Sequence, residues 1–165
     1  MTDLQEPLGA ARAAVDEMLA TAAGCAGTWA VPAAPGKWSP AQVVEHVARS
    51  YEEAAIDLTG RPSKLPNLPA PLRFVARKFL FERVLANGRF PRAKTNRAMN
   101  PASGPESPAA AATRLSDALG RFAEACRSAP NSRVASRVFG TVPLNDYVQF
   151  QTIHTRHHRA QIIRR

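Results

Sequence analysis

Three of the four histidines in this chain lie close together near its C-terminal end: His154, His157 and His158. His154 and His158 are four residues apart, a spacing that places two side chains on one face of an α-helix. Two imidazoles on successive turns can supply two nitrogens to one transition-metal ion, at about 2.0–2.1 Å each. The fourth histidine, His46, lies in an earlier helical segment. We therefore predict a three-histidine metal site in which the fold brings His46 against His154 and His158.

The residues between and around these histidines also limit which kinds of metal site are possible. The residues between His154 and His158 do not include the glutamate of the His-Glu-x-x-His motif, so a zinc protease of that type is disfavoured. Three histidine nitrogens leave coordination positions open for water or substrate, which is typical of catalytic metal sites. The alternatives are surface histidines in a basic helix and histidines that serve only the packing of the fold.

Other polar residues are candidates for supporting roles. His157 points about 100° away from each of the two predicted ligands on its helix, so we expect it beside a ligand or in solvent. Gln161 lies on the stripe of the two ligands and can orient one of them or a bound water. Glu45 is turned away from the site, so Glu53 is the better candidate for a base. The catalytic residue itself stays unknown.

The size and composition fit a single domain over residues 1–165. The chain has 45% hydrophobic residues, enough for an ordinary core. No apolar run approaches the roughly 18–20 residues of a membrane span, and the N-terminus has neither the basic start nor the apolar segment of a secretory signal. We therefore expect a cytoplasmic protein in which Cys25 and Cys126 are reduced thiols.

Hydrophobic periodicity and helix-capping residues position the predicted site. The second helix has the strongest start signal: Ser39 can cap it, Pro40 suits the first position, Gln42 completes a capping box, and Trp38 can pack on Val43. The same signals predict four long helices, at residues 7–24, 40–59, 108–130 and 143–163.

The connections between these helices are irregular or weakly helical. A short amphipathic helix is predicted over residues 72–86, and residues 90–107 are predicted to be irregular. Residues 130–141 form a loop that is extended at 133–139, and no strand pattern predicts a sheet. The predicted fold is all-α: an antiparallel four-helix bundle with a long, partly helical crossover insert between helices two and three, a fold that often hosts metal sites.

The positive charge of the chain is concentrated in residues 61–97. Ten basic residues stand there against a single acidic one, Glu82, and this excess of nine equals the net charge of +9 for the whole chain. Such a stretch can be a solvated surface, or it can meet an acidic ligand, an anionic lipid surface or nucleic acid. The ten basic residues are Arg61, Lys64, Arg73, Arg77, Lys78, Arg83, Arg89, Arg92, Lys94 and Arg97.

Two motifs resemble a known family. The run from Trp38 to His46, Trp-Ser-Pro-Ala-Gln-Val-Val-Glu-His, is similar to the start of the second helix in the DinB-like (YfiT-type) metal-binding bundles. The run from Phe150 to Ile162 resembles their last helix. Shorter segments resemble an uncharacterised subgroup of DinB-like proteins; they are Phe90-Pro-Arg, Lys94-Thr-Asn and Val138-Phe-Gly. Where that subgroup often has a His-Pro pair, this chain has Arg137 and Val138.

The resemblance implies a function as well as a fold. It implies that one histidine of helix two and two of helix four are the ligands, which fall on His46, His154 and His158, and that they hold a divalent metal, nickel or zinc. It also implies a homodimer and a small-molecule substrate. Characterised members of the family include S-transferases and isomerases that use a low-molecular-weight thiol such as mycothiol or bacillithiol. The Ala-, Arg- and Pro-rich composition indicates a bacterial source with a GC-rich genome.

These observations lead to three functional hypotheses. The first is a metal-dependent enzyme, either a hydrolase or a thiol-dependent transferase. The second is a catalytically silent metal-binding or dimerisation bundle. The third, which we rank last, is a binder of nucleic acid or an anionic surface through the basic insert and its phenylalanines, Phe74, Phe79, Phe81 and Phe90. No nucleic-acid-binding motif supports that third hypothesis, and these aromatics also have the spacing of a helix that packs on the bundle.

Overall fold

The computed structural model describes residues 3–91 and 95–162, and it is mostly helical with a small two-stranded sheet. Arg92 and Lys94 of the basic insert, and position 163 at the predicted end of the last helix, lie outside the described residues. The elements are α1 (Gln5–Ala23), η1 (Ala26–Thr28), α2 (Pro40–Thr59), α3 (Ala70–Ala76), η2 (Arg77–Phe81), α4 (Glu82–Asn87), η3 (Arg97–Met99), α5 (Pro108–Ser128), β1 (Arg133–Ser136), β2 (Gly140–Pro143) and α6 (Leu144–Arg159).

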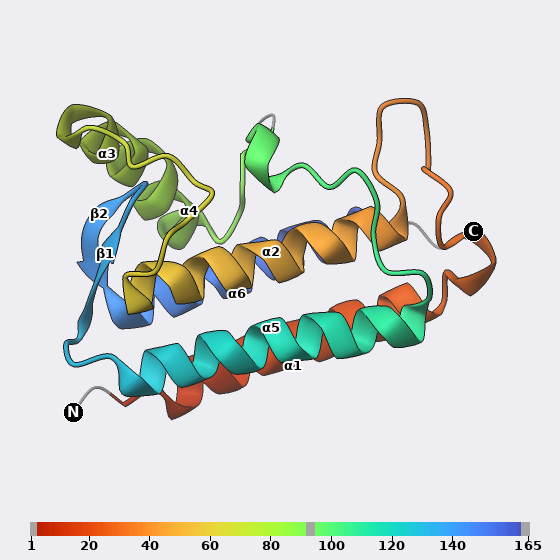
Figure 1. Ribbon diagram of the computed structural model, residues 1–165, viewed down its shortest axis with the longest axis horizontal. Coiled ribbons are helices and arrows are strands. Elements are labelled where there is room, and N and C mark those ends of the chain that lie inside the picture. The colour runs from red at the N-terminus through yellow and green to blue at the C-terminus, as the bar shows by residue number, and fades with distance from the viewer. Residues whose placement is uncertain (1–2, 92–94, 163–165) are drawn as a thin grey trace.

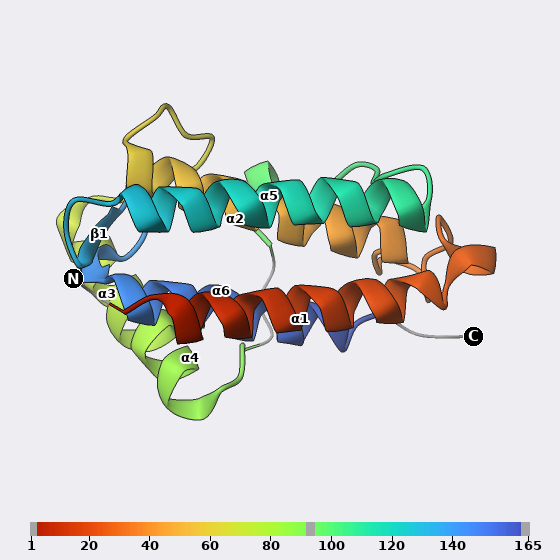
Figure 2. The ribbon, with the colours of Figure 1, turned by 90° about the horizontal axis from the view of Figure 1, so that it is seen from below.

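The four longest described helices lie side by side, with α2 against α5 and α6, and α1 against the same two helices (Figures 1 and 2). His46 of α2 meets His154 of α6 while Asp57 of α2 meets Tyr147, so these two helices run antiparallel, as predicted. The expectation of antiparallel neighbours fails for α2 and α5. These run in the same direction, because the long crossover returns the chain to the end where α2 began.

The start of α2 has the predicted capping box. The Ser39 hydroxyl accepts a hydrogen bond from the Gln42 amide at 3.3 Å, and the Gln42 side-chain oxygen accepts one from the Ser39 amide at 3.0 Å. At the other end, Gly60 closes the helix in the left-handed region, with φ of 67°. These two local signals fix the extent of the helix that carries His46.

The crossover is tied to the beginning of α2. The side-chain nitrogen of Gln42, Nε2, donates to the carbonyl oxygens of Pro101 and Ala102, at 3.1 and 3.3 Å. Gly104 packs directly on the backbone of α2, since a Cβ atom there would lie 2.1 Å from the Ala41 carbonyl oxygen. The irregular part of the crossover is therefore held across the same helix that presents His46.

The prediction that the chain has no sheet is wrong. β1 and β2 form an antiparallel hairpin in which Val134 pairs with Val142, and both side chains are buried. Asp57 of α2 anchors it: its carboxylate accepts hydrogen bonds from the Tyr147 hydroxyl at 2.9 Å and from the Arg137 amide at 3.4 Å. Strands of four residues carry too few alternations to stand out in a sequence.

The core fills the space between the long helices and contains large side chains from each of them. Cys25 and Cys126 are both buried in it, and no disulfide joins them. Within residues 3–91 and 95–162, no helix has the combination of length and hydropathy that crossing a bilayer requires. The largest fully buried side chains include Met18, Tyr51, Leu115, Phe122 and Leu144.

Candidate metal centre

The fold brings together the three histidines that the sequence singled out. His46 Nε2 lies 3.2 Å from His154 Nε2, and His158 Nε2 lies 3.0 Å from the same atom. One ligand atom from each ring lies within 4.8 Å of the other two, so the three side chains form a group that can hold a metal ion. All three are buried, with exposed fractions of 4%, 9% and 6% in chain order.

Hydrogen bonds at the far side of two rings determine which nitrogen carries the proton. His46 Nδ1 lies 2.8 Å from the carbonyl oxygen of Met99, which can only accept, so Nδ1 must be the protonated nitrogen. His158 Nδ1 lies 2.9 Å from the Gln161 side-chain oxygen and donates to it in the same way. In both rings Nε2 is therefore left with a bare lone pair that points at His154.

His154 cannot satisfy both of these lone pairs. A neutral imidazole has one N–H group, so its Nε2 can donate to only one of the two neighbouring Nε2 atoms. Its own Nδ1 is buried and has no hydrogen-bond partner among the described residues. A cation at the meeting point removes the conflict, because it accepts all three lone pairs at once.

The distances from His154 Nε2 to the other two nitrogens fit such a cation. With metal–nitrogen bonds of about 2.0–2.1 Å, two ligand nitrogens lie about 2.9 Å apart at a right angle and about 3.3 Å apart at a tetrahedral angle. The separations of 3.2 and 3.0 Å between His154 and the other two rings fall within this interval, and the three ligand atoms together lie within 4.8 Å of one another. A set of three imidazoles suits zinc and nickel, both of which bind histidine well, and suits magnesium or calcium poorly because those ions prefer oxygen.

The surroundings keep the three rings neutral. Burial is the main cause that lowers the pKa of His46, holds the pKa of His154 well below 6.5 and lowers that of His158 to about 3. For His154 and His158, the neighbouring imidazoles lower the pKa further, because a second positive charge would be repelled. Neutral imidazole is the form that binds metals, so the site needs little deprotonation at neutral pH.

Aromatic side chains pack against the three histidine rings. The Trp38 ring lies 4.8 Å from the His46 ring and 6.0 Å from that of His158, while Phe90 lies 5.1 Å from the ring of His154. Trp38 is fixed by the crossover, because its Nε1–H donates to Asn100 at 3.0 Å. These rings limit the access of water on their sides, which strengthens electrostatic interactions within the site.

Two predicted supporting residues lie beside the three candidate ligands. Gln161 contacts both neighbouring histidines: its oxygen accepts from His158, and its amide nitrogen lies 3.1 Å from Nε2 of His157. His157 is half-buried and does not join the converging nitrogens. The predicted role of Gln161 as an orienting residue thus has a geometric basis, and the interpretation of His157 as a neighbour of a ligand agrees with this contact.

The carboxylates suggested by the sequence lie elsewhere. Glu45 pairs with Arg49 at 2.8 Å and with Arg114 at 3.2 Å, on the side of α2 that meets α5. The Glu53 carboxylate accepts a hydrogen bond from the Ser63 hydroxyl at 2.6 Å and is not part of the histidine group. Among the described residues, no carboxylate joins that group.

Sequence reasoning missed the role of Met99 and part of the role of Trp38. Met99 acts through its backbone carbonyl, which every residue has, so no side-chain signal marks it. Trp38 was predicted to pack on Val43, and its contact with His46 depends on the course of the crossover. Arg137, which stands where the subgroup that these motifs resemble often has histidine, forms an ion pair with Asp57 at 3.8 Å and donates to the Arg61 carbonyl. Its side chain is therefore engaged in holding the hairpin.

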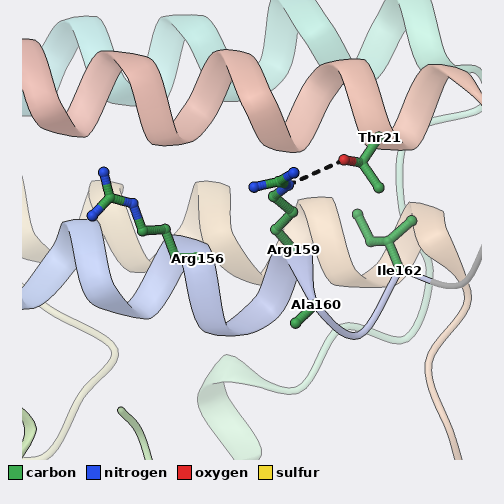
Figure 3. Close-up of a pocket in the computed structure, with 5 residues that line it drawn as sticks. All are labelled: Thr21, Arg156, Arg159, Ala160 and Ile162. Atoms are coloured by element: carbon green, nitrogen blue, oxygen red, sulfur yellow. Dashed lines mark hydrogen bonds between the residues drawn. The ribbon is translucent and has the colours of Figure 1, made fainter. Parts of the chain in front are cut away.

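A pocket of about 460 Å³ lies on another face of α6, between that helix and α1 (Figure 3). Arg159 reaches across it and donates to the Thr21 hydroxyl at 3.2 Å and to Glu17. The histidines face α2, so this pocket does not open onto them. The residues that line it are Thr21, Arg156, Arg159, Ala160 and Ile162.

Comparison with known proteins identifies the family. Neither the curated proteins nor the solved structures gave a match to this chain. The sequence profile of the DinB superfamily matches residues 7–162, from the first turn of α1 to beyond the end of α6. That range contains all three converging histidines and nearly the whole chain, so this protein belongs to the DinB superfamily.

Proposed function

We propose that His46, His154 and His158 bind one divalent metal ion, zinc or nickel, and that the protein is a metal-dependent enzyme. The observation that carries this proposal is that the Nε2 atoms of His46 and His158 lie 3.2 and 3.0 Å from Nε2 of His154, whose buried Nδ1 has no partner among the described residues. A purely structural cluster would leave at least one lone pair facing another, which costs free energy in a buried site.

The residues around the ligands have defined roles in this proposal. The Met99 carbonyl and the Gln161 amide hold the His46 and His158 rings so that their Nε2 atoms face inward. Trp38 and Phe90 exclude water from two sides of the site. Bound there, the metal supplies Lewis acidity, which lowers the pKa of a water or thiol that reaches an open coordination position.

The absence of a carboxylate from the described histidine group favours a thiol co-substrate over hydrolysis. A free thiol has a pKa of about 8.5 and loses its proton far more readily than water, so it depends less on a neighbouring base. The net charge of +9 also favours an acidic small molecule. We therefore place a low-molecular-weight thiol transfer first and metal-dependent hydrolysis second.

Metal binding is tested first, on protein purified without a polyhistidine tag. The wild type should bind about one zinc or nickel ion per chain, and His158→Ala should lower the affinity by at least about tenfold. His157→Ala is the matched control, since its ring lies next to the ligand but outside the converging group. Equal metal content in wild type and His158→Ala would remove His158 from the ligand set.

Activity is tested separately on the metal-loaded protein. Thiols of the mycothiol and bacillithiol type should be consumed with an electrophilic acceptor, and chelation should stop the reaction. A panel of ester and amide substrates tests hydrolysis in the same way. Full metal occupancy without turnover in either panel would favour the silent metal-binding bundle.

We also propose that residues 1–165 form one domain with the four-helix bundle layout implied by the resemblance, in a cytoplasmic homodimer. The contacts among α1, α2, α5 and α6 support the single domain, because each of these helices packs on at least two of the others. Sedimentation equilibrium measures the mass in solution. A mass near 17.8 kDa at all concentrations would exclude the dimer.

A further inference from the structure

The crossover carries an exposed apolar face that the metal centre does not use. Leu72 and Val75 of α3 and Phe79 of the π-helical turn η2 are 52%, 47% and 65% exposed. We call these three residues the outer face. Phe74 beside them is 56% exposed. Among the described residues, only one other large hydrophobic side chain is similarly exposed, Val31 in the loop before α2.

The opposite side of the same helical segment is firmly packed. Phe81 and Val84 are buried, and the Phe81 ring lies 5.0 Å from Phe139 and 5.1 Å from Phe150 of α6. Figures 1 and 2 show α3 and α4 outside the group of four long helices. The alternative that these phenylalanines pack on the bundle thus holds for Phe81 and Phe90, which both contact Phe150, whereas Phe74 and Phe79 are exposed. The outer face is held in a defined position and left without a partner within the described chain.

The helical segment that carries the outer face has an excess of positive charge. Residues 70–87 contain Arg73, Arg77, Lys78 and Arg83 against Glu82, a net charge of +3. Glu82 is already paired, with Lys78 at 2.8 Å and with Arg77 at 3.7 Å. Arg83 is exposed and forms no ion pair among the described residues. The surface therefore combines large apolar side chains with an excess of cations.

We propose that residues 70–87 dock onto an anionic lipid surface, with the helix lying in the plane of the headgroups. Leu72, Val75 and Phe79 enter the boundary of the acyl chains, while the exposed Lys78 and Arg83 meet lipid phosphates. This combination of bulky apolar residues and flanking cations is what interfacial helices use to bind membranes without spanning them.

Two other occupants fit the observations less well. A second copy of the chain placed on the same face would bring Arg73, Arg83 and their symmetry mates together, and like charges would oppose the contact. Nucleic acid would satisfy the cations, but it offers no apolar environment for Leu72 and Val75. A lipid surface is the partner that satisfies both features of the segment.

The test is co-sedimentation of the full chain with vesicles of phosphatidylcholine containing about 30% phosphatidylglycerol. The wild type should bind these vesicles, bind pure phosphatidylcholine weakly, and lose most of its binding at about 0.5 M salt. Phe79→Ser should weaken binding at least about tenfold, because it removes the most exposed apolar side chain of the outer face. Arg83→Gln should weaken binding about fivefold.

Matched controls separate this surface from general effects of charge and hydrophobicity. Val31→Ser removes another exposed apolar side chain, and Arg12→Gln removes an exposed cation on α1. Both should bind as the wild type does, and unchanged melting temperatures verify that all four variants fold. The proposal is overturned if the wild type does not bind the anionic vesicles or if Phe79→Ser binds as well as Val31→Ser. It is also overturned if sedimentation shows a dimer that only Phe79→Ser dissociates, or if oligonucleotide binding exceeds vesicle binding.

Discussion

The substitution His154→Leu separates a metal ligand from a structural core histidine. In the metal-free protein, His154 can donate to only one of its two neighbours, so two buried nitrogens stay unsatisfied: its own Nδ1 and one Nε2. Leucine removes the unsatisfied Nδ1, but it also leaves the neighbouring Nε2 that had accepted from His154 without a donor, so the number of unsatisfied nitrogens does not change. The variant loses the single hydrogen bond that His154 donates, but it leaves no additional buried nitrogen without a partner.

The remaining difference is the burial of an apolar side chain in place of an imidazole. His154 is only 9% exposed, and its ring already packs against Phe90. We expect the metal-free variant to be more stable than the wild type by about 1 kcal/mol. For a domain of this size that difference raises the melting temperature by about 2–4 °C. A fully hydrogen-bonded structural histidine would instead make the variant less stable by about 1–3 kcal/mol.

Addition of metal should make the wild type more stable than His154→Leu. At a free metal concentration of about 100 times the dissociation constant, the wild type gains about 2.7 kcal/mol of unfolding free energy, and the variant gains little. Thermal denaturation with chelator and then with zinc or nickel measures both effects, and His157→Leu serves as the control. The reasoning fails if metal-free His154→Leu melts well below the wild type, or if metal stabilises both proteins equally.

Three further predictions concern the neighbours of the site and the anchors of the fold. Gln161→Leu removes the partner of His158 Nδ1 and should lower metal affinity by about 10–100-fold, measured by competition with a chelating dye; an unchanged affinity would show that the His158 ring needs no such support. Burial raises the pKa of Asp57 above its ordinary value of 3.8, so this carboxyl contributes stability at low pH that is lost as the pH rises through the folded-state pKa. Urea denaturation at a series of pH values should show the wild type losing stability relative to Asp57→Asn as the pH rises from about 3.8, and parallel curves would contradict the assignment. Ser39→Ala removes the cap of α2 and should cost about 1 kcal/mol in urea denaturation, whereas Ser128→Ala near the end of α5 should cost little.

Local interactions account for what could be predicted from the sequence. The capping box at Ser39 and Gln42 uses residues three positions apart, so the start of α2 was visible before any packing was known. The spacing of His154 and His158 likewise follows from the helix repeat alone. The pairing of these residues with His46 was predicted from the bundle and the family resemblance, and the structure brings the three rings together.

Contacts between distant segments account for what the sequence did not predict. The hairpin of Val134 and Val142 is too short to produce a strand pattern, and it forms because the bundle offers it a buried surface and the Asp57 carboxylate. Exposure of Phe79 beside buried Phe81 depends on which side of the crossover helix meets α6.

The same distinction between local and long-range causes applies to the candidate metal centre. The imidazoles and their helical spacing are properties of the sequence, because side-chain chemistry and the 3.6-residue repeat are local. The proton positions on His46 and His158 come from a backbone carbonyl at Met99 and an amide at Gln161. Any residue can supply a backbone carbonyl, so the sequence does not show which one will meet the His46 ring. The folded course of the crossover brings the Met99 carbonyl within hydrogen-bonding distance of it.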